Sequence, residues 1–198
     1  MISRHLIIAV VVMVVVALAM GFYVWRMPHR ANIAPTAANT QPVAPPASGP
    51  TEKVILYVAY DDSGSLRARA ASIPLPAGRQ ERAQELLRTL LDIYLDKSSP
   101  HRLGEGSEIR DVYLVDPGLA VIDVNGAFAN LHRSGVLVEE LTVASLVETL
   151  SANIPGISRV KILVDGNQRD TLAGHIDLTN FFAVPALSQL AAQLQNVP

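Results

Sequence analysis

The longest apolar segment of the chain runs without a charged residue from Leu6 to Trp25. As a helix, its 20 residues would span about 30 Å, which is the thickness of the hydrocarbon core of a bilayer. Tyr23 and Trp25 lie at its end, where aromatic rings favour the membrane interface. The pattern predicts a transmembrane signal-anchor at 6–25 that follows a cytoplasmic N-terminus at 1–5.

A cleaved secretory signal is the alternative interpretation of this segment, with the small residues Ala17 and Ala19 at the cleavage site. The apolar run continues six residues beyond Ala19, which favours the uncleaved anchor. In both interpretations the remainder of the chain leaves the cytoplasm. With the anchor retained, we expect a single-pass cell-membrane protein whose C-terminal domain is extracytoplasmic, in the periplasm.

A linker is predicted at 26–51. Its stretch ANIAPTAANTQPVAPPASGPT, from 31 to 51, has no charged side chain and few large apolar ones, so it cannot bury a core of its own. Its prolines favour extended backbone of about 3.1 Å per residue, which limits its length to roughly 60 Å. The linker therefore holds the folded part of the chain at a distance from the membrane.

Two helices are predicted from apolar side chains that recur at helical spacing. The segment RQERAQELLRTLLDIYLD, at 79–96, carries one apolar stripe and an opposite polar face. The stripe consists of Ala83, Leu86, Leu87, Leu90, Leu91 and Tyr94. The second helix is expected from Val136 to Asn153, with Glu139 and Glu140 in its first turn, where acidic groups suit the helix dipole. Its predicted buried face holds Leu141, Ala144, Val147 and Leu150.

The strands are predicted from short runs of β-branched and aromatic residues. KVILYVAY at 53–60 indicates a buried strand that ends in a turn, and LRARAASIPL at 66–75 indicates an edge strand because proline ends it. The segment 109–126 holds two apolar runs joined by Asp-Pro-Gly, a hairpin signal. A further strand is expected at 157–166, and a last short one near 175–178.

The order of these elements predicts the fold class. One small α+β domain at 52–182 should pack two helices on a mostly antiparallel sheet, in a βαββαβ-type order. Residues 183–198 are expected to be a C-terminal tail that could form a short amphipathic helix.

Charge and cysteine content exclude several functions. The first 51 residues contain no acid, and only three of the 16 Lys and Arg residues lie there, so the remainder carries 13 basic against 18 acidic side chains. This mild acidity argues against a nucleic-acid partner, which needs a clustered basic face. The chain has no cysteine, which excludes disulfides, thiol catalysis, thiolate metal sites and a lipid-modified N-terminal cysteine.

The segment VKILVDGNQRDTLAGHIDL raises the question of catalysis, because it brings Asp165, Asp170, His175 and Asp177 close together in sequence. On a strand, His175 and Asp177 would share one face and could orient a base. No nucleophile accompanies them in sequence, since the nearest candidates, Thr149 and Ser151, lie on a helix with an apolar inner face. We therefore predict no catalytic residue.

No metal or cofactor site is predicted either. The histidines outside the N-terminal region, His101, His132 and His175, are never three or four residues apart as on a metal-binding helix face. They are interpreted as solvated loop residues. The loop DDSGS resembles the start of a calcium loop but has neither the glycine nor the glutamate that such a loop requires.

Three segments of the domain resemble a known family: YLVDPGLAVIDVNGAF, LTVASLVETLSANIPGISRVKILVDG and LAGHIDL. In this order they are similar to the GerMN domain of sporulation and spore germination proteins of the bacterial envelope. The resemblance implies a non-catalytic α/β module that a lipid or a single helix tethers outside the membrane, similar to ring-forming modules of envelope assemblies. Unlike the lipoprotein members this chain has no lipid-accepting cysteine, and unlike the tandem members it has one copy.

The sequence thus favours a membrane-anchored extracytoplasmic binding or scaffolding module without catalysis, linked to sporulation, germination or cell-wall processes. The alternatives are an enzyme acting on envelope polymers and a small-ligand carrier. Expected partners are the membrane, through the N-terminal helix, and envelope proteins or cell-wall polymer, but no nucleic acid. A second copy of the chain is a further candidate partner.

Overall fold

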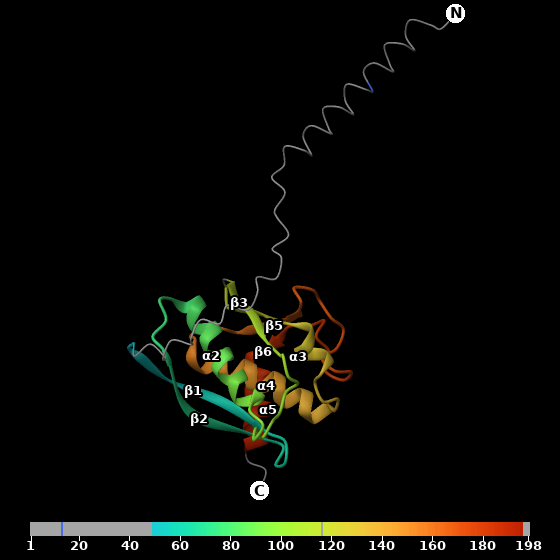
Figure 1. Ribbon diagram of the computed structural model, residues 1–198, viewed down its shortest axis with the longest axis horizontal. Helices are drawn as coiled ribbons and strands as arrows, with labels where there is room; N and C mark the ends of the chain where they lie inside the picture. Colours follow the sequence, from blue (N-terminus) through green and yellow to red (C-terminus); the bar gives the residue numbers. More distant parts are fainter. Residues whose placement is uncertain (1–12, 14–48, 116, 196–198) are drawn as a thin grey trace, which may run out of the picture. The chain divides into compact units, whose positions relative to one another are not determined.

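The computed structural model describes Met13 and residues 49–115 and 117–195 (Figure 1). The predicted anchor at 6–25, except for Met13, and nearly all of the linker at 26–51 lie outside the described residues. Within the described part of the chain, no helix is both long and apolar enough to cross a membrane. The anchor therefore stays a prediction from sequence.

The first two strands form a hairpin that is a sheet of its own. β1 (Thr51–Tyr60) pairs antiparallel with β2 (Ser65–Pro74) over their whole length. Both strands were predicted, and β2 is an edge strand as expected, since β1 is its only strand partner within residues 49–115 and 117–195. The sequence predicted one sheet, but the structure has two. The β1–β2 hairpin does not pair with the other described strands, because helix side chains bond the outer backbone edge of β1.

The second sheet has four strands in the order β3-β4-β5-β6. β3 (Ile109–Val115) and β4 (Leu119–Val124) form the predicted hairpin. β5 (Arg159–Val164) pairs parallel with β4, and β6 (Phe182–Ala183) pairs antiparallel with β5. The parallel pair requires a long crossover connection, and the helices between β4 and β5 supply it.

Four helices accompany these sheets in the described part of the chain. α2 (Arg79–Leu95) and α4 (Val136–Asn153) are the predicted helices, and all six residues of the predicted stripe on α2 are buried. α3 (Gly126–Asn130) is one short turn that begins where the Asn125 side chain accepts the N–H of Phe128. α5 (Val184–Gln195) occupies the predicted tail, packs against α4 and β2, and completes an α+β architecture.

The predicted strand at 175–178 does not form. Its segment makes a single isolated bridge, between Thr171 and Asp177, and is otherwise irregular. The backbone N–H groups of His175 and Ile176 donate to the side chain of Glu139 instead of to a neighbouring strand. A buried carboxylate thus replaces the strand partner that the alternating pattern suggested.

α4 covers the outer backbone edge of β1 with polar side chains spaced four residues apart. Thr149 Oγ1 accepts the N–H of Tyr57 at 3.0 Å, and Ser145 Oγ donates to the carbonyl of Tyr57 at 2.7 Å. Asn153 accepts the N–H of Ile55 at 3.1 Å and donates to its carbonyl at 2.6 Å. The amide of Asn153 therefore bonds β1 as a backbone peptide of a neighbouring strand would.

A side chain of α2 forms hydrogen bonds with the backbone edge of β3 in the same way. The side-chain oxygen of Gln80 accepts the N–H of Leu114 at 3.1 Å, and its nitrogen donates to the carbonyl of Val112. A helix amide thus completes the hydrogen bonds of an edge strand in each sheet, which satisfies backbone groups that burial would otherwise leave unpaired.

Candidate functional site

The LAGHIDL segment wraps around a buried carboxylate. Glu139, in the first turn of α4, has no exposed surface. Its Oε2 accepts the backbone N–H groups of Ala173, His175 and Ile176 at 3.1, 3.1 and 2.9 Å. Its Oε1 lies 2.8 Å from Nδ1 of His175 and accepts the N–H of Gly135 at 3.3 Å. Both oxygens are therefore fully engaged by donors.

These donors keep Glu139 ionised. Burial acts to raise the pKa of Glu139, but the hydrogen bonds from Ile176, His175 and Ala173 outweigh burial and lower that pKa to about 2. Because a carboxylate only accepts, Nδ1 of His175 carries the proton between them. Glu139 is thus a fixed anion that holds a loop, and it has no proton to exchange near neutral pH.

His175 and Asp177 do not form the pair that the sequence suggested. His175 faces Glu139, whereas Asp177 Oδ1 accepts the N–H and hydroxyl of Thr179 at 2.7 and 2.6 Å. Asp177 Oδ2 also accepts from Asn180 at 2.7 Å, and these bonds lower the pKa of Asp177, the hydroxyl of Thr179 most strongly. Asp177 is a turn cap, and the hypothesis of a shared base on one strand face is wrong.

The other residues of that hypothesis are also separated. Asp165 has a φ of 51° in the turn after β5, and its carboxylate meets Arg110 at 3.1 Å. Asp170 is exposed. Thr149 bonds the edge of β1, and Ser151 donates to a carbonyl of its own helix. The structure therefore distributes these side chains over turns, a helix and a strand edge.

A second polar cluster, which the sequence did not predict, links four side chains inside the domain. Asp61 Oδ1 lies 2.6 Å from Nδ1 of His101, and His101 Nε2 lies 2.7 Å from Oγ1 of Thr142. The same hydroxyl lies 2.7 Å from Nε2 of His132. His101 and His132 were interpreted as solvated, but they are 1% and 7% exposed. We call these four residues the histidine cluster.

The protons of the histidine cluster follow from its acceptors. Nδ1 of His132 lies 2.7 Å from the carbonyl of Arg133, so this nitrogen carries a proton. The hydroxyl of Thr142 donates to the carbonyl of Val138 at 3.0 Å, and burial lowers the pKa of His132, which favours its neutral form. Nδ1 of His101 faces the carboxylate of Asp61, which only accepts, so this nitrogen carries a proton.

The order carboxylate, imidazole, hydroxyl resembles the triad of hydrolases, but this hydroxyl is not available for attack. Thr142 has no exposed surface, and its oxygen is surrounded by two imidazoles and the carbonyl of Val138. Burial acts to raise the pKa of Asp61, yet the hydrogen bond and charge of His101 outweigh it and lower that pKa. The cluster ties three loops to α4.

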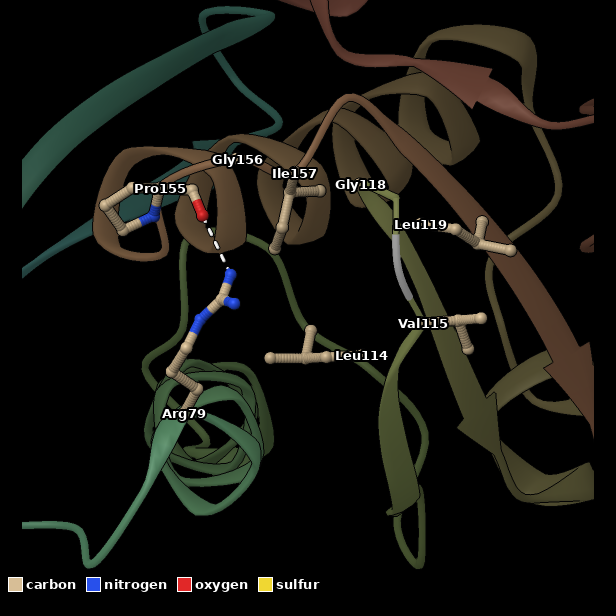
Figure 2. A pocket seen from close by; sticks show the side chains of 8 residues that line it. All are labelled: Arg79, Leu114, Val115, Gly118, Leu119, Pro155, Gly156 and Ile157. Atoms are coloured by element: carbon tan, nitrogen blue, oxygen red, sulfur yellow. Dashed lines mark hydrogen bonds between the residues drawn. The ribbon is translucent and has the colours of Figure 1, made fainter.

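The cavities near these elements are small or open to solvent. Figure 2 shows a pocket of about 140 Å³ between the start of α2, the β3–β4 turn and the end of α4, where Arg79 donates to the carbonyl of Pro155 at 2.8 Å. Ligand pockets usually enclose about 300 Å³ or more. In the described part of the chain, no group of three His, Asp or Glu residues could hold a metal ion.

The comparisons with known proteins concern the fold and the family. A family model described as "Germane: Sporulation and spore germination" matches residues 55–170. A comparison with curated proteins gives no match. Among solved structures, the tandem GerMN domains of the sporulation protein GerM from Bacillus subtilis match with a TM-score of 0.50 and 18% identity, over 68% of this chain and 46% of that chain.

Two further structures match at similar identity. The first GerMN domain of the same protein has a TM-score of 0.45 and 17% identity, over 65% of this chain and 94% of that chain. A candidate lipoprotein from Clostridium perfringens has a TM-score of 0.46 and 18% identity, over 79% of this chain and 99% of that chain.

This chain spans about half the length of the tandem GerMN structure, and the likeness to it shows a shared fold. The family model covers more than half of the chain and includes β1 from Ile55 onward, α2, α4 and β5. The protein therefore belongs to the Germane family of sporulation and spore germination domains, as the GerMN resemblance of its sequence indicated.

Proposed function

We propose that this protein is a membrane-anchored, extracytoplasmic module that binds or scaffolds other components of the cell envelope without catalysing a reaction. The observation that carries the proposal is the use of its buried polar side chains. Glu139 and Thr142, which a catalytic site would expose to substrate, are completely buried and bond loops of the same chain. This use of its buried polar groups supports a binding or scaffolding role for the domain.

The proposed location rests on the sequence before the domain. The charge-free run at 6–25 has the length of a membrane helix, and the proline-containing linker at 26–51 separates it from the domain. The family description and the GerM relative both refer to sporulation. We therefore propose that the module acts in the envelope during sporulation, germination or related cell-wall processes, with envelope proteins or cell-wall polymer as partners.

The experiment tests on which side of the membrane the domain lies and which envelope components it binds. An epitope tag placed after Pro198 should co-sediment with membranes and be digested by protease added to spheroplasts, while a cytoplasmic marker survives. Chemical crosslinking should then trap specific envelope components on the full chain. The matched control keeps residues 1–51 and replaces the domain by an unrelated folded protein, which should trap none of them. A protease-protected tag, or turnover of cell-wall fragments by the purified chain, would refute the proposal.

A further inference from the structure

The backbone edges of the two sheets are not treated alike. The outer edge of β1 is bonded by Ser145, Thr149 and Asn153, and that of β3 by Gln80. β6, at the other side of the four-stranded sheet, has only two residues. β2 is ten residues long and, among the described strands, has a partner on one side only, β1. A long exposed edge strand is a template for another strand unless the fold protects it.

The pairing register identifies the backbone groups on the free edge of β2. Along an antiparallel strand, residues alternately direct their N–H and C=O toward and away from the neighbouring strand. Ile55 and Tyr57 direct theirs toward α4, and their cross-strand partners are Ala70 and Ala68. Ala68 and Ala70 therefore direct their N–H and C=O away from β1. Among the described residues, no side chain and no loop backbone bonds them.

Side chains do not block this edge. β2 lies at the outer side of the hairpin in Figure 1, and its residues from Arg67 to Ala70 are exposed although α5 packs against the strand. The backbone N–H and C=O groups that point outward belong to alanines, whose methyl side chains are too small to cover them. An open depression bounded by Lys53, Ala70, Ala71 and Ser72 lies beside them. An added strand would find room for its alternate side chains there.

The charge of the edge selects the partner. Arg67 and Arg69 are two residues apart and share one face of β2, which contains no acidic residue. Neither has an ion pair with a described residue, and the guanidinium of Arg67 is held 4.5 Å above the ring of Tyr60. Asp92 and Asp96 line the depression beside Arg69 and partly offset its charge, which leaves Arg67 as the stronger attraction for a carboxylate.

We propose that the free edge of β2 binds an extended acidic segment of a partner protein, which adds to the hairpin as a third β-strand. The inference rests on the proposed binding role and names its surface. Backbone bonds to Ala68 and Ala70 provide the attachment, and acidic side chains opposite Arg67 and Arg69 provide selectivity, since opposite charges across neighbouring strands stabilise pairing.

Two other strands fit the edge less well. The chain's own linker at 26–51 has no acidic side chain and several prolines, which lack the N–H that a ladder requires. A second copy of β2 would bring the arginines of both copies opposite or diagonal to one another, and like charges at these positions weaken pairing. The geometry therefore favours a different chain that carries carboxylates.

The test uses the purified full chain and a fluorescent eight-residue peptide in which Glu alternates with Thr. Binding is measured by fluorescence anisotropy, and hydrogen–deuterium exchange locates the contact. The matched peptide replaces every Glu with Lys. Ala70→Pro removes one free-edge N–H without touching the bonds to β1, and Ala70→Ser changes the same position but keeps the N–H. Arg67→Gln with Arg69→Gln removes the two charges.

We expect the Glu peptide to bind, to slow exchange at residues 68–72 and to lose at least about tenfold in affinity with Ala70→Pro but not with Ala70→Ser. The double Gln variant should bind about threefold to tenfold more weakly, and the Lys peptide at least as weakly. Circular dichroism and urea unfolding check that each variant is folded.

Three results would overturn the inference: no binding of the Glu peptide, equal binding of the Lys peptide, or an affinity that Ala70→Pro leaves unchanged. A dimer in sedimentation that Ala70→Pro dissociates would assign the edge to a second copy instead. Crosslinking separates this inference from the proposed function. If the full chain and its Ala70→Pro variant trap the same envelope partners equally, the binding role stands and the β2 edge is not its surface.

Discussion

The buried carboxylate of Glu139 provides the sharpest test of how the domain is held together. Glu139→Gln keeps the size of the side chain but replaces one acceptor oxygen with a donor NH₂ group. The five hydrogen-bond donors around the carboxylate come from Gly135 and the loop at 173–176, and an amide can accept them at one oxygen only. At least one donor of the loop or of the helix start must therefore lose its partner.

The magnitude follows from the pKa. The fall in the pKa of Glu139 from its usual value of 4.5 to about 2 corresponds to about 3 kcal/mol, because one pKa unit equals about 1.4 kcal/mol. The folded pKa lies below the unfolded one, so this stabilisation is complete above about pH 4.5 and disappears as the pH falls toward 2. Glu139→Gln should therefore destabilise the domain strongly at pH 7 and little near pH 2.

The assay is urea unfolding of residues 48–198 between pH 2 and 7, with hydrogen exchange at Ala173, His175 and Ile176. The neighbouring variant Glu140→Gln is the matched control, because Glu140 is partly exposed and should cost less than about 0.5 kcal/mol. Equal losses for the two variants at pH 7 would refute the reasoning. So would a Glu139→Gln loss that stays constant down to pH 2.

Three further changes test other contacts. Asn153→Ala should lower the unfolding free energy by about 1–2 kcal/mol and speed amide exchange at Ile55, whose two backbone bonds it removes; unchanged exchange would contradict this. Thr142→Val should cost about 1–3 kcal/mol in urea unfolding by leaving buried imidazole nitrogens unpaired, and Thr142→Ser should recover most of it. Ile122→Ala should lower the unfolding free energy by about 2–5 kcal/mol, more than Val121→Ala, since Ile122 is completely buried and Val121 only partly. A larger loss with Val121→Ala would mean that the core lies on the opposite face of this sheet.

The elements with strong local signals could be predicted from the sequence. The apolar stripe of α2 and the Asp-Pro-Gly turn between β3 and β4 depend on neighbours within a few residues, which the pattern displays directly. Gly118 in this turn has a φ of 71°, a backbone conformation that glycine adopts readily. α3 and β6 are too short, at five and two residues, to produce a periodic signal.

The polar contacts could not be predicted because their partners lie far apart along the chain. Glu139 was interpreted only as a first-turn acid that suits the helix dipole, yet its donors at Ala173 and Ile176 follow 34 and 37 residues later. The pairing of His101 with Thr142 likewise spans 41 residues. One signal was available: Ser145, Thr149 and Asn153 recur every four residues along α4, which indicates a polar stripe that bonds a neighbouring element inside the domain.

That stripe has a mechanical consequence. Residue 51, the last of the predicted linker, is the first residue of β1, so a force transmitted through the linker would enter the domain at this strand, and its component along the strand axis would load the bonds on both sides of β1. The ladder to β2 on one side and the bonds to α4 on the other lie across that axis. A tensile load would therefore shear these bonds together instead of opening them one after another. β1 would thus pass this force on to the rest of the domain. Its hydrogen bonds with the side chains of α4 would oppose its separation from the fold.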